Sequence, residues 1–385
     1  MIDYLIVARS GRAIAASAKQ AGYKVSVADY FADEDTKSFS ESVHQLQYHC
    51  DGFEIESLLG HIEDVISDYP DAKLVLGSGF EDRLELLDSL SNTLPVLANS
   101  KETILRLKEP ISFCEILDKE GIKHPHTTYS RPVDAKKYLV KKVAGIGGEH
   151  ISWFENDLAY DESSDELGDE SGFYYQEYIE GTVSSVVFLA DGEHAHIVGF
   201  NQQLQTDQFV EMPFLYLGAM TTNEVSPQHK TIIQKIINNI TAETGLKGLC
   251  GLDYIVDEFA EVIVLEVNTR PPATFELHET KQQSLFDAHL SCFDGLLIDN
   301  KCLNDKKDKC KGYVIFYANK EIKISDRINW PLWVKDRPSS ESVIALKFPV
   351  CTVHAEENSM DKLKSVLFNR LKEIESIIVA MQNAA

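Results

Sequence analysis

The hydrophobic positions of the first hundred residues form short continuous runs separated by longer amphipathic stretches. The run Tyr4–Ala8 is apolar throughout, which is typical of a parallel strand buried on both faces. Further strands are predicted at residues 25–28 and 74–76, and helices at residues 13–21, 55–68 and 77–90, the last opened by Gly77-Ser78-Gly79. This order of elements predicts a doubly wound βαβ domain of the α/β class, which we place at residues 1–98.

The middle of the chain changes to an α+β pattern. A helix is predicted within residues 99–123, most clearly at 109–120, and strands at residues 138–143, 174–179, 183–190 and 195–200. Two further strands, at residues 251–256 and 262–267, form a predicted hairpin. Between these groups a helix at residues 226–245 places five isoleucines on one face: Ile232, Ile233, Ile236, Ile237 and Ile240. We assign this second unit to residues 99–300, and we expect the acidic stretch 161–170 to be a solvated loop.

The last part of the chain, residues 301–385, follows a segment rich in Asp and Lys at 304–311. It ends in a predicted helix at residues 360–381, whose apolar stripe we expect to pack against its own unit. That stripe contains Leu363, Val366, Leu367, Leu371, Ile374, Ile377 and Ile378. We therefore expect a small C-terminal α+β unit at residues 301–385.

The turn after the first strand does not match a dinucleotide-binding fingerprint. The segment Ala8-Arg9-Ser10-Gly11-Arg12-Ala13 has one glycine where the fingerprint has three. Asp29 stands about 20 residues further on, where such a domain binds ribose, but a single Asp at a strand end is common. The sequence therefore does not predict NAD or FAD binding.

The charge of the chain excludes several classes of partner. With 37 Lys and Arg against 61 Asp and Glu, the formal net charge is −24, which repels nucleic acid and anionic membranes. No apolar run reaches the roughly 18 residues of a membrane-spanning helix, and the N-terminal residues lack the features of a secretory signal. We expect a cytoplasmic protein that acts on small molecules and binds phosphates through a few local cations, glycines or metal ions.

Three segments carry candidate chemistry, and the first is glycine-rich. Lys141 and Lys142 end a predicted strand and precede a turn that contains Gly145, Gly147 and Gly148. Glycines let backbone N–H groups approach a polyphosphate without a Cβ in the way. Because side chains alternate along a strand, only one of the two lysines can point inward toward a phosphate, and the sequence leaves open which one.

The second segment is the predicted hairpin. Glu266, Asn268 and Arg270 alternate along one strand and project from one face, and Asp253 lies on the neighbouring strand. Two carboxylates and an amide oxygen are hard ligands suited to Mg²⁺ that carries phosphate oxygens. A guanidinium beside them supplies a planar fork for phosphoryl charge. The alternative, a solvated polar face of a sheet, explains this cluster less well.

The third segment is Tyr175-Gln176-Glu177-Tyr178-Ile179-Glu180-Gly181, an extended stretch whose backbone could read an adenine edge. In order and spacing, the three segments together resemble the ATP-grasp superfamily of carboxylate–amine and carboxylate–thiol ligases. Its marks are a lysine before a glycine-rich lid, a hinge ending in glycine, and a final Asp/Glu…Glu-x-Asn-x-Arg motif. Lys108, in the helix before the lid, matches a further lysine of the family.

The resemblance covers about residues 1–285, and it implies an ATP-grasp architecture. The βαβ domain would precede a two-lobed ATP-binding module with a lid at about 124–180. Lys108, Lys141, Gly147 and Gly148 would hold the phosphates of ATP. Gln176, with the backbone of Glu177 and Ile179, would hold adenine. Asp253, Glu266 and Asn268 would bind one or two Mg²⁺ or Mn²⁺ ions, and Arg270 and Lys141 would be the catalytic cations.

The implied activity is an ATP-dependent ligase that forms an amide from a carboxylate and an amine through an acyl phosphate. The tail, with Asp336-Arg337-Pro338 and the segment 348–355, is similar to predicted ATP-dependent carboligases related to glutamate ligases of C1-carrier cofactor biosynthesis. Glutamate is thus a candidate carboxylate. The alternatives are a non-catalytic ATP-binding regulator, or a carboxylase or kinase on the same fold. The sequence does not identify the substrates, and it leaves open whether the protein is a homo-oligomer. The ribose contact is also open, with Glu180 as one candidate.

Overall fold

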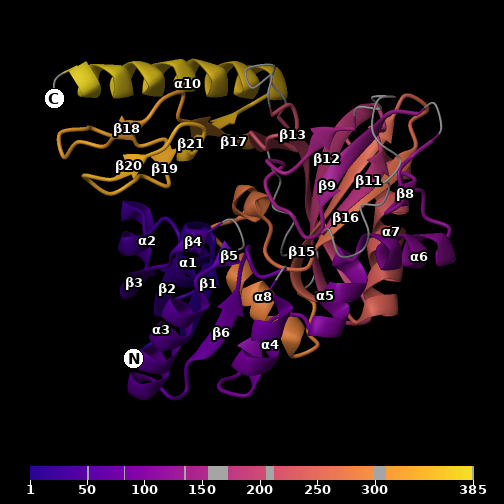
Figure 1. Ribbon diagram of the computed structural model, residues 1–385, viewed down its shortest axis with the longest axis horizontal. Helices are drawn as coiled ribbons and strands as arrows, with labels where there is room; N and C mark the ends of the chain where they lie inside the picture. The colour runs from indigo at the N-terminus through magenta and orange to yellow at the C-terminus, as the bar shows by residue number, and fades with distance from the viewer. Residues whose placement is uncertain are drawn as a thin grey trace.

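The computed structural model describes residues 1–49, 52–81, 83–133, 136–154, 172–204, 212–298 and 309–383. The chain forms an N-terminal α/β layer, a large antiparallel sheet and a small lid sheet (Figure 1). The mixed α/β and α+β class predicted from the sequence is confirmed. The acidic stretch 161–170 and the boundary predicted at residue 300 lie outside the described residues.

The N-terminal sheet is parallel, with strand order β3-β2-β1-β6-β7. Its strands are β1 (Tyr4–Ala8), β2 (Val25–Asp29), β3 (Ser42–Gln45), β6 (Lys73–Leu76) and β7 (Val96–Leu97), and a two-strand hairpin, β4 (Tyr48–His49) with β5 (Gly52–Phe53), lies outside it. Its helices are α1 (Arg12–Gln20), α2 (Glu34–Phe39), α3 (Ile55–Asp68) and α4 (Leu84–Ser91). Asp29, which closes β2, accepts the N–H groups of Gly11 and Ala32 at 2.8 and 2.7 Å. The Asp29 carboxylate thus stabilises the turns after β1 and β2, and this structural role is sufficient to explain an Asp at the end of β2.

The helix predicted to begin at Gly77 begins instead at Leu84, so that prediction is wrong at its start. Gly79 has φ +102°, outside the helical region, and the Glu81 carboxylate accepts the backbone N–H groups of Gly79 and Phe80. These bonds hold the segment after β6 as a loop. Periodicity in the sequence could not predict this loop, because the loop is stabilised by hydrogen bonds from its own backbone to the Glu81 side chain.

The single helix expected within residues 99–123 is two helices, α5 (Lys101–Lys108) and α6 (Pro110–Lys119). They break at Glu109, which has extended backbone and accepts the N–H groups of Ile111 and Ser112. Pro110 has no N–H to donate and its ring disfavours helical backbone in the residue before it, so a new helix begins there.

The large sheet is antiparallel and has the strand order β16-β15-β12-β13-β14-β17-β21-β19. Its strands are β12 (Gly181–Asp191), β13 (Ala195–Gln203), β14 (Gly218–Thr222), β15 (Lys247–Asp257), β16 (Val262–Asn268), β17 (Cys310–Tyr317), β19 (Val334–Lys335) and β21 (Pro349–Glu357). Strands from residues 310–357 therefore extend the same sheet as those of residues 181–268. Successive residues of β12 face opposite sides, so Phe188 packs with α7 (Pro227–Thr244), and Val187 and Leu189 pack with α8 (Leu285–Phe293).

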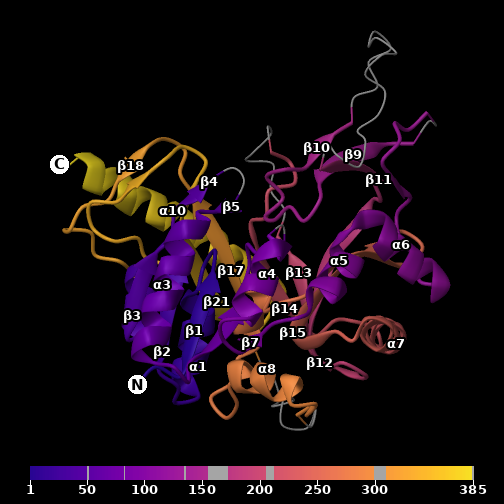
Figure 2. The ribbon, with the colours of Figure 1, turned by 60° about the horizontal axis from the view of Figure 1, so that its bottom comes forward.

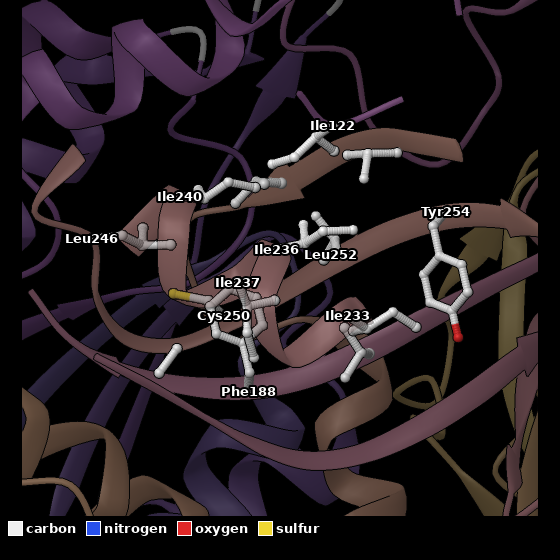
Figure 3. Packing of buried hydrophobic residues seen from close by; sticks show 14 of the residues in the cluster. Ile122, Phe188, Ile233, Ile236, Ile237, Ile240, Leu246, Cys250, Leu252 and Tyr254 are labelled. Carbon is white, nitrogen blue, oxygen red and sulfur yellow. The ribbon is translucent and has the colours of Figure 1, made fainter. Parts of the chain in front are cut away.

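The core beneath α7 is an aliphatic cluster. Ile233, Ile236, Ile237 and Ile240 are buried against Phe188 and strand β15 (Figure 3). Their spacing of three, one and three residues follows one helical face. Ile232, predicted on the same face, is 45% exposed, because it lies outside the edge of the stripe, about 90° around the helix from its centre.

A four-stranded antiparallel sheet, β10-β9-β11-β8, lies within the range predicted for the lid, residues 124–180. Its strands are β8 (Thr127–Thr128), β9 (Tyr138–Lys142), β10 (Ser152–Trp153) and β11 (Phe173–Glu177). Figure 2 shows β9, β10 and β11 together at the upper right, away from the N-terminal sheet.

The C-terminal helix α10 (Met360–Asn383) runs along β17 and β21, across the top of Figure 1. Leu363, Leu367, Ile374 and Ile378 are buried in this contact, and the rest of the predicted stripe packs around them. A hairpin of β18 (Ile322–Lys323) and β20 (Val343–Ile344) and a short 3₁₀ helix, η3 (Ala273–His278), complete the described elements. Among the described residues, no helix is long and apolar enough to span a membrane.

Arg12, at the start of α1, joins three parts of the chain. Its Nη1 and Nη2 each donate to Glu276 of η3 at 2.6 Å, and its Nε and Nη2 donate to Asp336 at 2.8 and 3.0 Å. Arg12 is 4% exposed. Lys335 adds a bond to Glu276 at 2.9 Å, and Thr352 donates to Asp336. We call Arg12, Glu276 and Asp336 the arginine clasp.

Replacing Arg12 by Ala should lower the free energy of unfolding by about 3 kcal/mol, because Glu276 and Asp336 would stay buried without their shared cation. Urea unfolding followed by tryptophan fluorescence measures this change. Lys323→Ala is the control, since Lys323 and its partner Glu341 are 64% and 68% exposed and the pair should contribute less than about 1 kcal/mol. Equal, small effects of both substitutions would show that the clasp is not a structural centre.

Candidate active site

A cavity of about 950 Å³ opens where the N-terminal domain, the lid sheet and the large sheet meet. The N-terminal domain contributes Arg9 and Ser78, and the strands of the C-terminal unit contribute Tyr313 and Thr352. Apolar lining comes from α5, α6, β9 and β16: Leu107, Pro110, Phe113, Leu117, Leu139 and Val264. All eleven residues predicted for the site line this cavity. Their roles there stay predictions.

The predicted acidic hairpin forms one wall of the cavity. In the register of β15 and β16, Asp253 lies opposite Glu266, next to a bulge between Asp253 and Tyr254. Asn268 donates its Nδ2 hydrogen to Asp253 Oδ2 at 3.0 Å. Burial and the adjacent Glu266 charge raise the pKa of Asp253 to about 8. Desolvation acts against ionisation of Glu266 as well, but the charges of Lys108 and Lys141 outweigh it and lower the pKa of Glu266.

Two lysines approach these carboxylates from different elements. Lys108, the last residue of α5, places its Nζ 3.9 Å from Glu266 Oε2. Lys141 of β9 donates to Gln176 Oε1 of β11 at 2.7 Å. Burial lowers the pKa of Lys141, while the charges of Glu266 and Asp253 act in the opposite direction. Lys142 also lines the cavity, so both lysines reach it, but the Lys141 ammonium is the one that lies in the field of the acidic hairpin.

Arg270 follows β16 and is held by a residue of the N-terminal domain. Its Nε donates to Glu81 Oε1 at 2.7 Å, and its Nη1 makes a long contact of 3.4 Å with the Pro271 carbonyl. Glu81 is 5% exposed. Burial would raise the pKa of Glu81, but the charges of Arg270 and Lys108 outweigh it and lower that pKa to about 2. Sequence reasoning missed Glu81, although its place just after a parallel strand, at the ligand-binding edge of such sheets, was an available signal.

The glycine-rich turn is docked over the cavity. Gly147 and Gly148 have φ of +74° and +76°, and the Gly147 carbonyl accepts the Tyr216 N–H at 2.9 Å. A Cβ on Gly148 would lie 1.9 Å from the carbonyl oxygen of Phe214. The Phe214 ring also packs edge-on against Trp153 of β10, with ring centroids 5.2 Å apart. The turn therefore needs a glycine at position 148 to reach the segment 214–216.

The hinge segment lies between β11 and β12. Gln176 is buried, accepts from Lys141 and donates weakly to Thr127 at 3.4 Å. The Glu177 N–H donates to the His126 carbonyl, and the Glu177 side chain pairs with Lys136 at 2.8 Å. The N–H group and the side chain of Glu177 are therefore both engaged within the protein. Ile179 lines the cavity, whereas Glu180, considered for ribose, is exposed and does not line it.

A four-stranded sheet with a docked glycine-rich turn, beside an acidic hairpin and two lysines, is the arrangement that the resemblance to ATP-grasp proteins implied. In agreement, residues 110–274 match the ATP-grasp domain family. The resemblance found in the sequence is thus confirmed, and the chain carries an ATP-grasp domain in an ATP-grasp fold.

A curated relative is the tyramine–L-glutamate ligase of Methanocaldococcus fervens, which is 24% identical over 224 residues. That match covers 57% of this chain and 57% of the relative, so it spans little more than half of either protein.

Solved structures share the fold over nearly the whole chain. The L-amino acid ligase from Bacillus licheniformis has a TM-score of 0.67 at 13% identity, covering 97% of both chains. The biotin carboxylase from Campylobacter jejuni has a TM-score of 0.69 at 12% identity, covering 93% of this chain and 88% of its own. The N5-carboxyaminoimidazole ribonucleotide synthetase from Thermotoga maritima has a TM-score of 0.65 at 15% identity, covering 97% and 98%. Identities this low indicate a shared fold only.

Gly148→Ala should release the turn from the segment 214–216, because the added methyl group overlaps the Phe214 carbonyl. Hydrogen exchange of the Tyr216 amide measures the release, and we expect exchange to be at least about tenfold faster, equivalent to about 1.4 kcal/mol. Gly22→Ala is a matched control, since Gly22 also has positive φ, +91°, but has open space around it. Unchanged exchange in Gly148→Ala would contradict the docked position of the turn.

Proposed function

We propose that the protein is an ATP-dependent ligase that joins a carboxylate to an amine and releases ADP and phosphate. One observation carries the proposal: Lys108, Lys141 and Arg270 converge on the carboxylates Asp253 and Glu266 in a single cavity. In a chain of net charge −24, such a local group of cations suits a polyphosphate. In this proposal the cavity lies between units at residues 1–98, 99–300 and 301–385, with the lid at 124–180.

The acidic hairpin fits a divalent cation. Burial and the adjacent Glu266 charge raise the pKa of Asp253 to about 8, and a bound dication would offset the repulsion between the two carboxylates. Asp253, Glu266 and the amide oxygen of Asn268 would hold one or two Mg²⁺ or Mn²⁺ ions. When bound, the metal neutralises phosphate charge and orients the phosphate oxygens.

The remaining residues would bind ATP. Lys108 and Lys141 would pair with phosphate oxygens, and Lys141 would exchange its bond to Gln176 for one to the nucleotide. Backbone N–H groups of Gly147 and Gly148 would contact phosphate, because no side chain stands in the way at these two positions. Gln176, the Glu177 carbonyl and Ile179 would hold adenine between the hinge and the apolar lining of α6.

The reaction has two displacements. A substrate carboxylate oxygen attacks the γ-phosphorus, the bond to the bridging oxygen breaks, and ADP leaves with an acyl phosphate formed. The amine nitrogen then attacks the acyl carbon, loses a proton and displaces inorganic phosphate, leaving an amide. Arg270 would stabilise the charge on the transferred phosphoryl group in both steps. The docked turn would keep water from the acyl phosphate.

The comparisons favour an amide ligase among the alternatives. The curated relative joins tyramine to L-glutamate, so glutamate and an aromatic amine are the first substrates to test, and C1-carrier cofactor biosynthesis is the candidate setting. The structural neighbours include carboxylases as well as ligases, so the fold does not exclude a carboxylase or kinase. A non-catalytic regulator is less well supported, since each predicted metal ligand and cation is present and lines the cavity.

A screen of phosphate release with MgATP and paired carboxylates and amines, beginning with glutamate and tyramine, tests the proposal. We expect release of ADP and phosphate that needs both substrates, together with an amide detected by mass spectrometry. Bicarbonate in place of the carboxylate separates ligase from carboxylase. AMP and pyrophosphate as products would rule out the acyl phosphate, and ATP binding without turnover would favour a regulator.

Glu266→Gln and Arg270→Lys should each reduce turnover at least about a hundredfold, or about 2.7 kcal/mol of transition-state stabilisation. Glu266→Gln removes one charge from the metal site, so it should also require more Mg²⁺. Arg270→Lys keeps the charge but loses the two-pronged geometry, so its Mg²⁺ dependence should not change. Initial rates across a Mg²⁺ titration distinguish the two. Wild-type turnover and metal dependence in Glu266→Gln would mean that the hairpin is a solvated sheet face.

A further inference from the structure

We propose that Glu81 is a positioning residue, which fixes the guanidinium of Arg270 so that its outer edge faces the substrate. This inference rests on the proposed function, in which Arg270 contacts the transferred phosphoryl group. Neither the sequence motifs nor the comparisons assign a role to Glu81, which belongs to the N-terminal domain and lies 189 residues from Arg270 in the chain.

The first argument is the way in which the Glu81 carboxylate is used. Oε1 accepts the Arg270 Nε hydrogen at 2.7 Å, and Oε2 accepts the N–H groups of Gly79 and Phe80 at 3.0 and 3.2 Å. Both oxygens are occupied by protein donors, and the carboxylate is buried. Glu81 is therefore placed to hold a neighbour and not to take a proton from a substrate.

The second argument is which edge of Arg270 is held. Glu81 engages Nε, on the inner side of the guanidinium. Nη1 has only the 3.4 Å contact with Pro271, and Nη2 has no hydrogen bond to any residue that the structure describes. Arg270 lines the cavity. A planar fork held at Nε presents its terminal nitrogens in one orientation, which is the arrangement that two-pronged binding of a phosphoryl group or carboxylate needs.

The third argument concerns the loop that carries Glu81. Its carboxylate binds the backbone of its own loop, which follows β6 where helix α4 had been expected to begin. Position 81 is thereby fixed relative to the parallel sheet before it meets Arg270. A positioning residue acts through such rigid support, because a small displacement of a catalytic group lowers turnover more than it lowers substrate binding.

Glu81→Gln tests the inference, because an amide cannot satisfy both sides. If its oxygen accepts from Arg270, its NH₂ group faces the N–H groups of Gly79 and Phe80, and the reverse orientation faces Arg270 with a donor. In the full chain, with MgATP and the substrate pair found by phosphate release, we expect kcat to fall at least about thirtyfold. The KM for MgATP should change less than about threefold.

A double-substitution cycle separates positioning from a general structural role. Lysine at position 270 has no Nε–H to be held at that place, so Glu81→Gln should cost less than about threefold in kcat in the Arg270→Lys background. Equal losses in both backgrounds would overturn the inference. Glu81→Asp keeps the charge and should retain more activity than Glu81→Gln, which provides a second variant if the glutamine variant folds poorly.

A measurement independent of turnover completes the test. The Arg270 Nε–H, assigned by its loss in Arg270→Lys, should give a protected side-chain resonance in ¹⁵N NMR that Glu81→Gln removes. Glu243→Gln is the matched control, because Glu243 also joins two elements through ion pairs with Arg106 and Lys119, but outside the cavity. It should leave kcat and the resonance unchanged.

The outcomes also separate the two proposals. A wild-type chain that releases no phosphate with any substrate pair overturns the proposed function and, with it, a role for Glu81 in that reaction. An active wild-type chain whose Glu81→Gln variant keeps its kcat overturns the Glu81 inference alone.

Discussion

The arginine clasp is the contact on which the arrangement of the three parts of the chain depends. Arg12 begins the first helix of the chain, Glu276 lies in η3 after β16, and Asp336 lies just beyond β19. Four hydrogen bonds from one guanidinium fix their relative positions. Buried ion pairs contribute little net stability compared with apolar packing, but they tolerate few alternative arrangements. Here that constraint sets the width of the cavity, since all three residues line it.

Within the cavity, positive and negative side chains lie side by side, an arrangement that suits the binding of a polyanion in the proposed function. Three cations surround Asp253, Glu266 and Glu81, and each cation already has a protein partner. Of these contacts, only the one between Arg270 and Glu81 is a short ion pair, at 2.7 Å. The Lys108 contact is 3.9 Å long, and Lys141 is bonded to a neutral amide. A phosphate group can therefore compete for the lysines without breaking the anchor of the arginine.

The fold and the site contribute different kinds of information about function. Ligases and carboxylases share this architecture at 12–15% identity, because the sheet and helix packing tolerates almost any sequence with the right apolar pattern. In the proposed function, the hairpin, the glycine-rich turn and the two lysines would bind the nucleotide, which these chemistries have in common. The substrate would then contact the rest of the cavity wall, where Arg9, Ser78, Tyr313 and Thr352 come from two different parts of the chain.

The sequence by itself determined the features that depend on neighbours along the chain. Strand β1, helix α3 and the stripe of α7 were predicted from periodicity, and alternation along β16 placed Glu266, Asn268 and Arg270 together. Even the break at Pro110 was visible locally, although the expected helix ran through it. The contacts of Arg270 with Glu81, and of Arg12 with Glu276 and Asp336, join residues 189 to 324 positions apart. No periodicity encodes such pairs, because they exist only after separate elements have packed and buried charges have found their partners. The tertiary structure therefore decided how the cations are held and how the three parts of the chain enclose the cavity.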